Sequence, residues 1–293
     1  MTKQKPPVGN PFFERWAAPF RLPPFERIAP YHFLPALERA FAAHDAEIAV
    51  IAGETAAPTF QNTILAMELA GDELDRVGSV FNVLIGAHSN EALLAIEREY
   101  SPRRARHWNG ILLNGPLFRR VDALWQRRDT LGLNAEQARV LERHYLRFKR
   151  AGAALDADAK KRMAEISERL ATLGTTFSQN VLADENAYSL SLGSQADLAG
   201  LPDFVRASAQ QAAADRGLPG QVITLSRSLL VPFLTFSERR DLREQVWRAW
   251  TSRGEHAGAS DNRAIVREIL QLRGEQAALH GLACYADYAL DNT

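Results

Sequence analysis

From Pro30 onward, apolar residues recur every three or four positions in segments that end at glycine or proline. The longest of these segments has spacings of 3, 4, 3, 4 and 4 residues between Met163, Ile166, Leu170, Leu173, Phe177 and Val181. Such spacing places the side chains on one face of a helix and predicts antiparallel packing against a neighbouring helix. The chain therefore reads as one helix after another.

Several helix boundaries can also be predicted. Gly53 can end a first helix that begins after Pro30, and Thr59 is a suitable N-cap for the next one. Asn134 followed by Gln137 resembles a capping box that opens a helix to about residue 151. Ser237 is expected to cap a helix that carries Trp247. The tryptophans lie mostly on apolar stripes and are expected in the core, where they form no stacking platform for bases.

The periodicity changes near residue 187. Tyr188, Leu190 and Leu192 alternate with small or polar residues, which is typical of a half-buried strand, and residues 221–226 form a second β-prone run. Pro202 suits the start of a helix between the two. We therefore predict a mainly α chain with one small two-stranded β element.

Composition shifts divide the chain into four parts. Residues 1–30 contain six prolines besides Pro30 and are expected to form an extended Pro-rich arm, because proline fixes φ and donates no hydrogen bond. Residues 31–186 are predicted to be an N-terminal helical domain, 187–236 a small α/β junction, and 237–293 a further helical region.

Charge and cysteine content limit the classes of partner. Lysine and arginine together number 35, as do aspartate and glutamate, so no net field draws the chain to nucleic acid or to anionic lipid. The single cysteine, Cys284, cannot form an internal disulfide and fits a reducing compartment. Neither a signal sequence nor a run of 18 apolar residues is present. These features predict a soluble cytoplasmic protein that binds neither nucleic acid nor membrane.

Histidine spacing argues against a metal site. Zinc hydrolases of the His-Glu-x-x-His type need two histidines at i and i+4 on one helix face, and no such pair occurs. Two weaker pairs at i and i+3 remain, His44 with Glu47 and His88 with Glu91. They are better explained as helix-surface or helix-start residues, with Ser89 or Asn90 as an N-cap. We predict no catalytic, cofactor-binding or metal-ligating residue in this chain.

Arginine clusters are the remaining candidate for binding. One contains Arg103, Arg104 and Arg106, and the other runs from Arg119 to Arg128 on the outer positions of a helix. Guanidinium groups match the geometry of carboxylates, so such clusters could line an anion or peptide-carboxylate site. A solvated helix face with compensating acidic residues explains them equally simply and is favoured. No site is assigned there.

Short motifs recur along nearly the whole chain: Asn10-Pro11, Pro58 to Ile64, Arg76 to Phe81, Leu112 to Phe118, Phe177 to Asn180, Val222 to Leu225, Leu272 to Ala277, and Tyr285-Ala286. In this order they resemble the N-terminal part of the thimet oligopeptidase-like zinc metallopeptidases, the M3 family. The segments at 87–91 and 121–128 resemble most closely the bacterial peptidyl-dipeptidases, also called dipeptidyl carboxypeptidases.

The resemblance implies a hydrolase of short peptides whose helical body is split by a substrate channel. Residues 31–186 would then form one wall of the channel, and 237–293 would start the catalytic region and stop before the zinc motif. Zinc would belong to the full-length parent, and the partners would be short peptides and the C-terminal catalytic half of the same chain. We expect a truncated, inactive portion of a peptidase. The alternative is a stand-alone helical module that binds peptides or a protein without catalysis.

Overall fold

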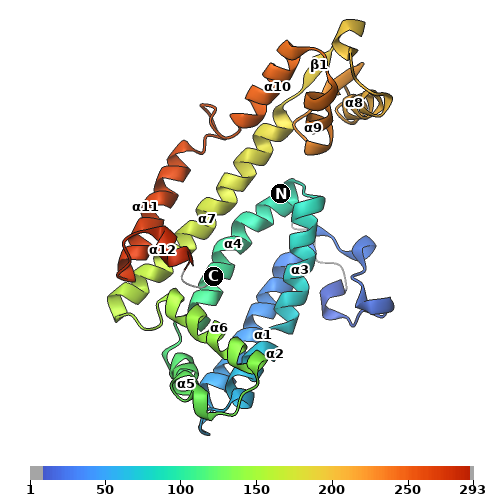
Figure 1. Cartoon of the computed structure of the whole chain (residues 1–293). Coiled ribbons are helices and arrows are strands. Elements are labelled where there is room, and N and C mark those ends of the chain that lie inside the picture. Colours follow the sequence, from blue (N-terminus) through green and yellow to red (C-terminus); the bar gives the residue numbers. More distant parts are fainter. Residues whose placement is uncertain (1–8, 291–293) are drawn as a thin grey trace. The chain divides into compact units, whose positions relative to one another are not determined.

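The computed structural model describes residues 9–290 (Figure 1). The chain divides into two compact units. The first contains the residues up to Thr172 together with those from Leu270 onward, and the second is Leu173–Ile269. Helices α7 (Ala157–Ala187) and α11 (Arg263–Leu279) contribute residues to both units. The prediction of a mainly helical chain with one small two-stranded β element is confirmed.

The first unit begins with four short 3-10 turns and continues with helices. The turns are η1 (Pro11–Phe13), η2 (Pro19–Arg21), η3 (Phe25–Arg27) and η4 (Pro30–His32). The elements that follow are α1 (Phe33–Gly53), η5 (Phe60–Leu65), α2 (Ala66–Leu69), α3 (Asp72–Ala87), α4 (Glu91–Leu112), α5 (Gly115–Gln126), η6 (Arg128–Thr130) and α6 (Ala135–Ala151). The first part of α7, the end of α11 and α12 (Tyr285–Leu290) complete this unit.

Side-chain caps fix where these helices start. Asn90 accepts a hydrogen bond from the backbone N–H of Leu93 at the start of α4, as the sequence predicts. Asn134 and Gln137 form the predicted reciprocal capping box of α6. Thr59 is also an N-cap, because its hydroxyl accepts from Asn62, but the element it opens is the π-helical turn η5.

Two apolar clusters form the core of the first unit. In one, the ring of Phe33 lies 5.1 Å from that of Phe81 and 5.2 Å from that of Phe12. Phe12 comes from the Pro-rich segment, so that segment is anchored in the core. The other cluster packs α5 against α6 and η5 through Ile64, Leu117, Val121, Leu124, Leu141 and Phe148.

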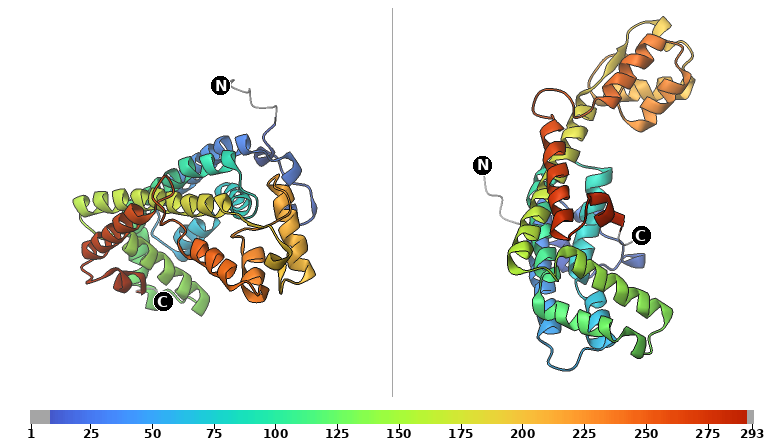
Figure 2. Two further views of the ribbon diagram at one scale, coloured as in Figure 1. Left: turned by 90° about the horizontal axis from the view of Figure 1, so that it is seen from above. Right: turned by 60° about the vertical axis from the view of Figure 1, so that its left-hand side comes forward.

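The second unit contains the sheet, in which Leu190 pairs with Ile223 and Leu192 with Gln221 in antiparallel register. One face of the sheet is apolar and packs in a core with Phe233 and Val246. Its buried residues are Leu190, Leu192 and Ile223. Figure 2 shows these elements gathered around the C-terminal end of α7. They are β1 (Leu190–Leu192), η7 (Gln195–Leu198), α8 (Asp203–Asp215), β2 (Gln221–Ile223), α9 (Arg227–Phe236) and α10 (Arg240–Thr251).

Three sequence-based expectations are wrong in detail. Ser237 ends α9, since its N–H bonds to the carbonyl of Phe233, and α10 starts later, at Arg240. Trp247 is 52% exposed, because it follows the buried Val246 and its side chain is turned about 100° around α10 away from it. Arg120 is buried on the inner face of α5, although the sequence suggests an outer position. Among the described residues, no helix combines the length and apolar composition that crossing a bilayer requires.

Candidate functional site, an arginine-lined groove

Helix α6 carries four arginines on one side. Arg139, Arg143, Arg147 and Arg150 follow one another at spacings of 4, 4 and 3 residues, which aligns them on a helix with 3.6 residues per turn. Leu141 and Phe148 are fully buried on the other side of α6. Burial of that apolar face fixes the orientation of the helix and leaves the arginines facing away from the core.

These arginines line a groove of about 850 Å³ in the first unit. Helix α4 contributes Arg104, Trp108 and Asn109, α7 contributes Met163 and Ser167, and the C-terminal part contributes Gln276 and Tyr288. Every residue that lines the groove belongs to the first unit. The floor is partly apolar, while the charge comes from the five arginines that line it: Arg104, Arg139, Arg143, Arg147 and Arg150.

The positive charge of the groove is only partly compensated. Arg139 pairs with Glu142 at 2.5 Å, whereas Arg104, Arg143, Arg147 and Arg150 form no ion pair with any residue that the structure describes. Glu68 is the one carboxylate among the described lining residues, and it lies 2.7 Å from His144 Nε2. Burial lowers the pKa of Arg147, the Glu68 carboxylate raises it, and the Arg104 charge lowers it.

Two of the guanidinium groups lie over aromatic rings. The guanidinium carbon of Arg147 is 4.2 Å from the centre of the Trp108 ring, and that of Arg150 is 4.6 Å from the centre of Tyr288. Tyr288 also donates its hydroxyl hydrogen to the backbone carbonyl of Arg150 at 2.9 Å. Arg150 Nη1 is buried and has no hydrogen-bond partner within the described residues. An unsatisfied buried donor is unfavourable by about 1 to 3 kcal/mol, so an acceptor that enters here gains a hydrogen bond.

The two arginine clusters of the sequence do not form one site. Arg104 lines the groove, but Arg103 pairs with Glu99 and Arg106 pairs with Glu168. None of the residues from Arg119 to Arg128 lines the groove. Sequence reasoning missed the row on α6, although its regular spacing could be read from the sequence by itself. Other residue types separate the four arginines in the sequence, so the arginines are not recognised there as a cluster.

The two histidine–glutamate pairs have different surroundings and do not ligate a common ion. His88 ends α3 and Glu91 begins α4, and both are exposed. Glu47 accepts a hydrogen bond from the backbone N–H of Gly71 at 2.7 Å. Within residues 9–290, no group of three or more histidine, cysteine, aspartate or glutamate side chains could hold a metal ion. The described donors therefore do not fit a zinc ion, and the expectation of no metal ligands stays a prediction.

His44 is part of a buried hydrogen-bonded chain. His107 Nε2 lies 2.9 Å from His44 Nδ1, and His107 Nδ1 lies 3.0 Å from a carboxylate oxygen of Asp45. Because the carboxylate accepts from Nδ1–H of His107, a neutral His107 accepts from His44 through Nε2. Burial lowers the pKa of both imidazoles, Asp45 raises the pKa of both, and His44 further lowers that of His107.

These shifts predict that acid destabilises the fold. The unfolded chain binds protons near pH 6.5, whereas burial keeps His44, His107 and His144 neutral to lower pH. The stability they provide is complete above about pH 6.5 and is lost as pH falls through the folded-state pKa values. We expect the free energy of unfolding in urea to fall by about 1.4 kcal/mol per pH unit for each extra proton that the unfolded chain binds.

The control is the exposed His88. The His88→Gln variant should keep the pH slope of the wild type, whereas His107→Gln should flatten it. Measurements between about pH 7.5 and pH 5 avoid the range in which the carboxylates titrate. A free energy of unfolding that stays constant over this interval would contradict the assignment of neutral buried histidines.

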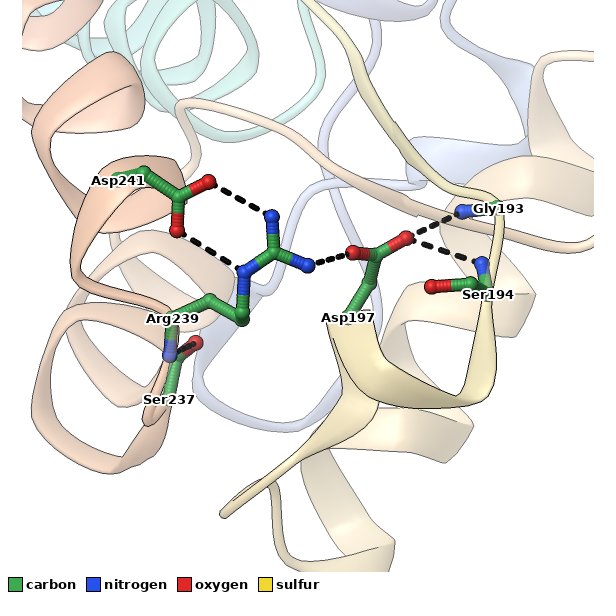
Figure 3. A network of polar contacts seen from close by, with 6 residues as sticks. All are labelled: Gly193, Ser194, Asp197, Ser237, Arg239 and Asp241. Carbon is green, nitrogen blue, oxygen red and sulfur yellow. Dashed lines mark hydrogen bonds and ion pairs between the residues drawn. The ribbon is translucent and has the colours of Figure 1, made fainter.

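A second polar cluster lies in the other unit and is structural (Figure 3). Arg239 forms two hydrogen bonds with the Asp241 carboxylate, at 2.9 and 2.6 Å, and a third with Asp197. The second oxygen of Asp197 accepts from the backbone N–H groups of Gly193 and Ser194. Hydrogen bonds from Arg239 lower the pKa of Asp241 to about 2. The network joins the end of β1 to the start of α10. Because each of its charges already has a partner, it offers no free group to a ligand.

Comparison with known proteins shows which peptidases the chain is similar to. The model of Peptidase family M3 matches residues 233–293. The chain is 38% identical over 282 residues to the dipeptidyl carboxypeptidase of Escherichia coli (strain K12), an alignment that covers 96% of this chain and 41% of that protein. It is also 30% identical over 273 residues to oligopeptidase A of Haemophilus influenzae, covering 92% of this chain and 40% of that protein.

These matches confirm the resemblance that the sequence motifs predict. The chain is similar to Peptidase family M3 over residues 233–293 and to a dipeptidyl carboxypeptidase over nearly its whole length. The dipeptidyl carboxypeptidase of Salmonella typhimurium is a further relative, 36% identical over 282 residues, with 96% of this chain and 42% of that protein covered. The chain thus spans about two-fifths of the length of the curated relatives it matches.

Proposed function

We propose that this chain is the non-catalytic N-terminal portion of a cytoplasmic zinc peptidase that hydrolyses short peptides. Residues 31–186 form one wall of the substrate channel, and residues 237–293 begin the catalytic region. Residues 1–30 act as an arm over the wall, and 187–236 are a junction between the two parts. Zinc and the groups that activate water belong to the C-terminal catalytic half of the same chain.

The observation that carries this proposal is where the family match falls. The match to Peptidase family M3 starts at residue 233 and runs to 293, close to the boundary that the sequence sets at 237. The residues before it align with peptidases of the same family, but the described part of them has no cluster of metal-binding side chains. This combination supports a helical wall that precedes the catalytic region.

A domain exchange tests the proposal. The chain would replace the aligned portion of the Escherichia coli dipeptidyl carboxypeptidase, which shares 38% of its residues. We expect the chimera to bind zinc and to release dipeptides from peptide C-termini, whereas the chain alone should hold no stoichiometric zinc and hydrolyse nothing. A folded, zinc-loaded chimera without activity would contradict the proposal, as would hydrolysis by the chain alone. Cleavage at internal bonds would instead favour the oligopeptidase type.

The alternative function is a stand-alone helical module that binds peptides or a protein without catalysis. The arginine-lined groove is the observation that favours it, because it is complete within the first unit. The reading frame beyond Thr293 distinguishes the two functions. A downstream His-Glu-x-x-His supports the peptidase, and a stop codon in a normally expressed gene supports the binding module.

A further inference from the structure

The arginines of α6 repeat at a distance that an extended peptide can match. Arg139, Arg143 and Arg147 are four residues apart, which corresponds to steps of about 6 Å along a helix axis. In an extended chain, side chains on one face repeat every second residue, at about 6.6 Å. Carboxylates at alternate positions of such a peptide would therefore meet successive arginines. Adjacent carboxylates would point to opposite faces, and half of them would miss the row.

The length of the row also suits a short peptide. From Arg139 to Arg150 the helix rises about 16 Å, which corresponds to about five residues of extended chain. A single small anion would contact only one or two of the guanidinium groups. Ser167, Asn109 and Gln276 line the same groove and can bond to a peptide backbone.

The aromatic rings of the groove are poorly placed for nucleic acid. Arg147 covers Trp108 and Arg150 covers Tyr288, at the distances given above. Bases bind to proteins largely by stacking on open aromatic faces, and here those faces are occupied by guanidinium groups. The same contacts hold the two arginines in place before any ligand arrives, which lowers the entropy lost when they bind a carboxylate.

We propose that the groove is a binding site for an extended acidic peptide that carries carboxylates at alternate positions. Arg143 and Arg147 bind two successive carboxylates. Arg150 binds a further acceptor, which satisfies its buried Nη1. The Glu68 carboxylate repels the ligand and limits its affinity. The site requires only residues of the first unit, so it does not depend on the proposed peptidase activity.

The first test measures binding to the full chain by fluorescence anisotropy. The probe is a labelled, C-terminally amidated Glu-Ala-Glu-Ala-Glu peptide at about 0.15 M salt, where surface attraction is largely screened. The double variant Arg143→Gln/Arg147→Gln should bind it about 10-fold or more weakly. The double variant Arg119→Gln/Arg127→Gln removes the same two charges from exposed positions outside the groove and should leave binding unchanged. Glu68→Gln should strengthen binding, and circular dichroism checks that each variant folds.

The second test compares peptides of equal charge and composition. Glu-Glu-Glu-Ala-Ala places adjacent carboxylates on opposite faces and should bind about threefold more weakly than the alternating peptide. Equal affinity for the two isomers would overturn the proposal, because only net charge would then matter. So would an equal loss in Arg119→Gln/Arg127→Gln and the groove variant, the absence of binding at this salt concentration, or tighter binding of single-stranded RNA or inorganic polyphosphate than of the peptide.

Discussion

Gly200→Ala should destabilise the second unit by about 3 to 5 kcal/mol, which is among the largest effects of a single methyl group expected in this chain. Gly200 has a φ of +77°, a left-handed conformation that L side chains rarely adopt. A Cβ at this position would collide with the backbone carbonyl oxygen of Phe236 and would lie 2.8 Å from Cγ of Glu238. Neither the carbonyl nor its segment can move freely, because the N–H of Glu238 bonds to the carbonyl of Ala199 at 3.0 Å.

Gly217→Ala is the matched control. Gly217 also has a positive φ, +64°, but no atom lies within 4 Å of the position that its Cβ would take. Its substitution should therefore show only the conformational effect, about 1 kcal/mol. The midpoint of urea unfolding, followed by tryptophan fluorescence, compares the two variants. Equal losses would show that the close approach of residues 199–200 to residues 236–238 does not hold in solution.

The boundaries of the helices could be predicted from sequence because the signals are local. The capping box at Asn134 occurs where the sequence places it, and α7 spans the segment with the apolar spacing, although Phe177 in that segment is 37% exposed. The β element could be predicted for the same reason. The role of Ser237 could not be predicted from sequence. A serine can follow a helix or precede one, and which of the two occurs depends on how α9 packs in the core.

The groove could be predicted only in part. Its cationic row lies on one helix and its spacing can be read from the sequence, but the residues opposite come from α4, α7 and α12, which are far apart along the chain. Their assembly depends on tertiary packing. Likewise, the hydrogen-bonded contact between His44 and His107 joins positions 63 residues apart, and no local pattern indicates it.

Arg120 shows how one arginine in a cluster differs from its neighbours. It lies between Leu117, Val121 and Leu124 on the inner face of α5 and is 7% exposed. Its Nη1 donates to the carbonyls of Glu54 and Ala56, at 2.7 and 3.1 Å, and its Nη2 donates to Asn62 at 3.0 Å. These bonds hold the loop between α1 and η5.

Arg120→Met should therefore destabilise the first unit by about 3 kcal/mol or more, because it removes three hydrogen bonds from a charged donor to Glu54, Ala56 and Asn62. Arg119→Met, one position away on the exposed face, should change the free energy of unfolding by less than about 0.5 kcal/mol. Arg120→Lys should fall between the two, since a single ammonium keeps the charge but cannot reach three acceptors with the geometry of a guanidinium fork. Urea unfolding of the three variants tests this order. If Arg119→Met lowered the free energy of unfolding as much as Arg120→Met does, the cluster would act through its summed charge. The hydrogen bonds from Arg120 to the loop would then contribute nothing to stability.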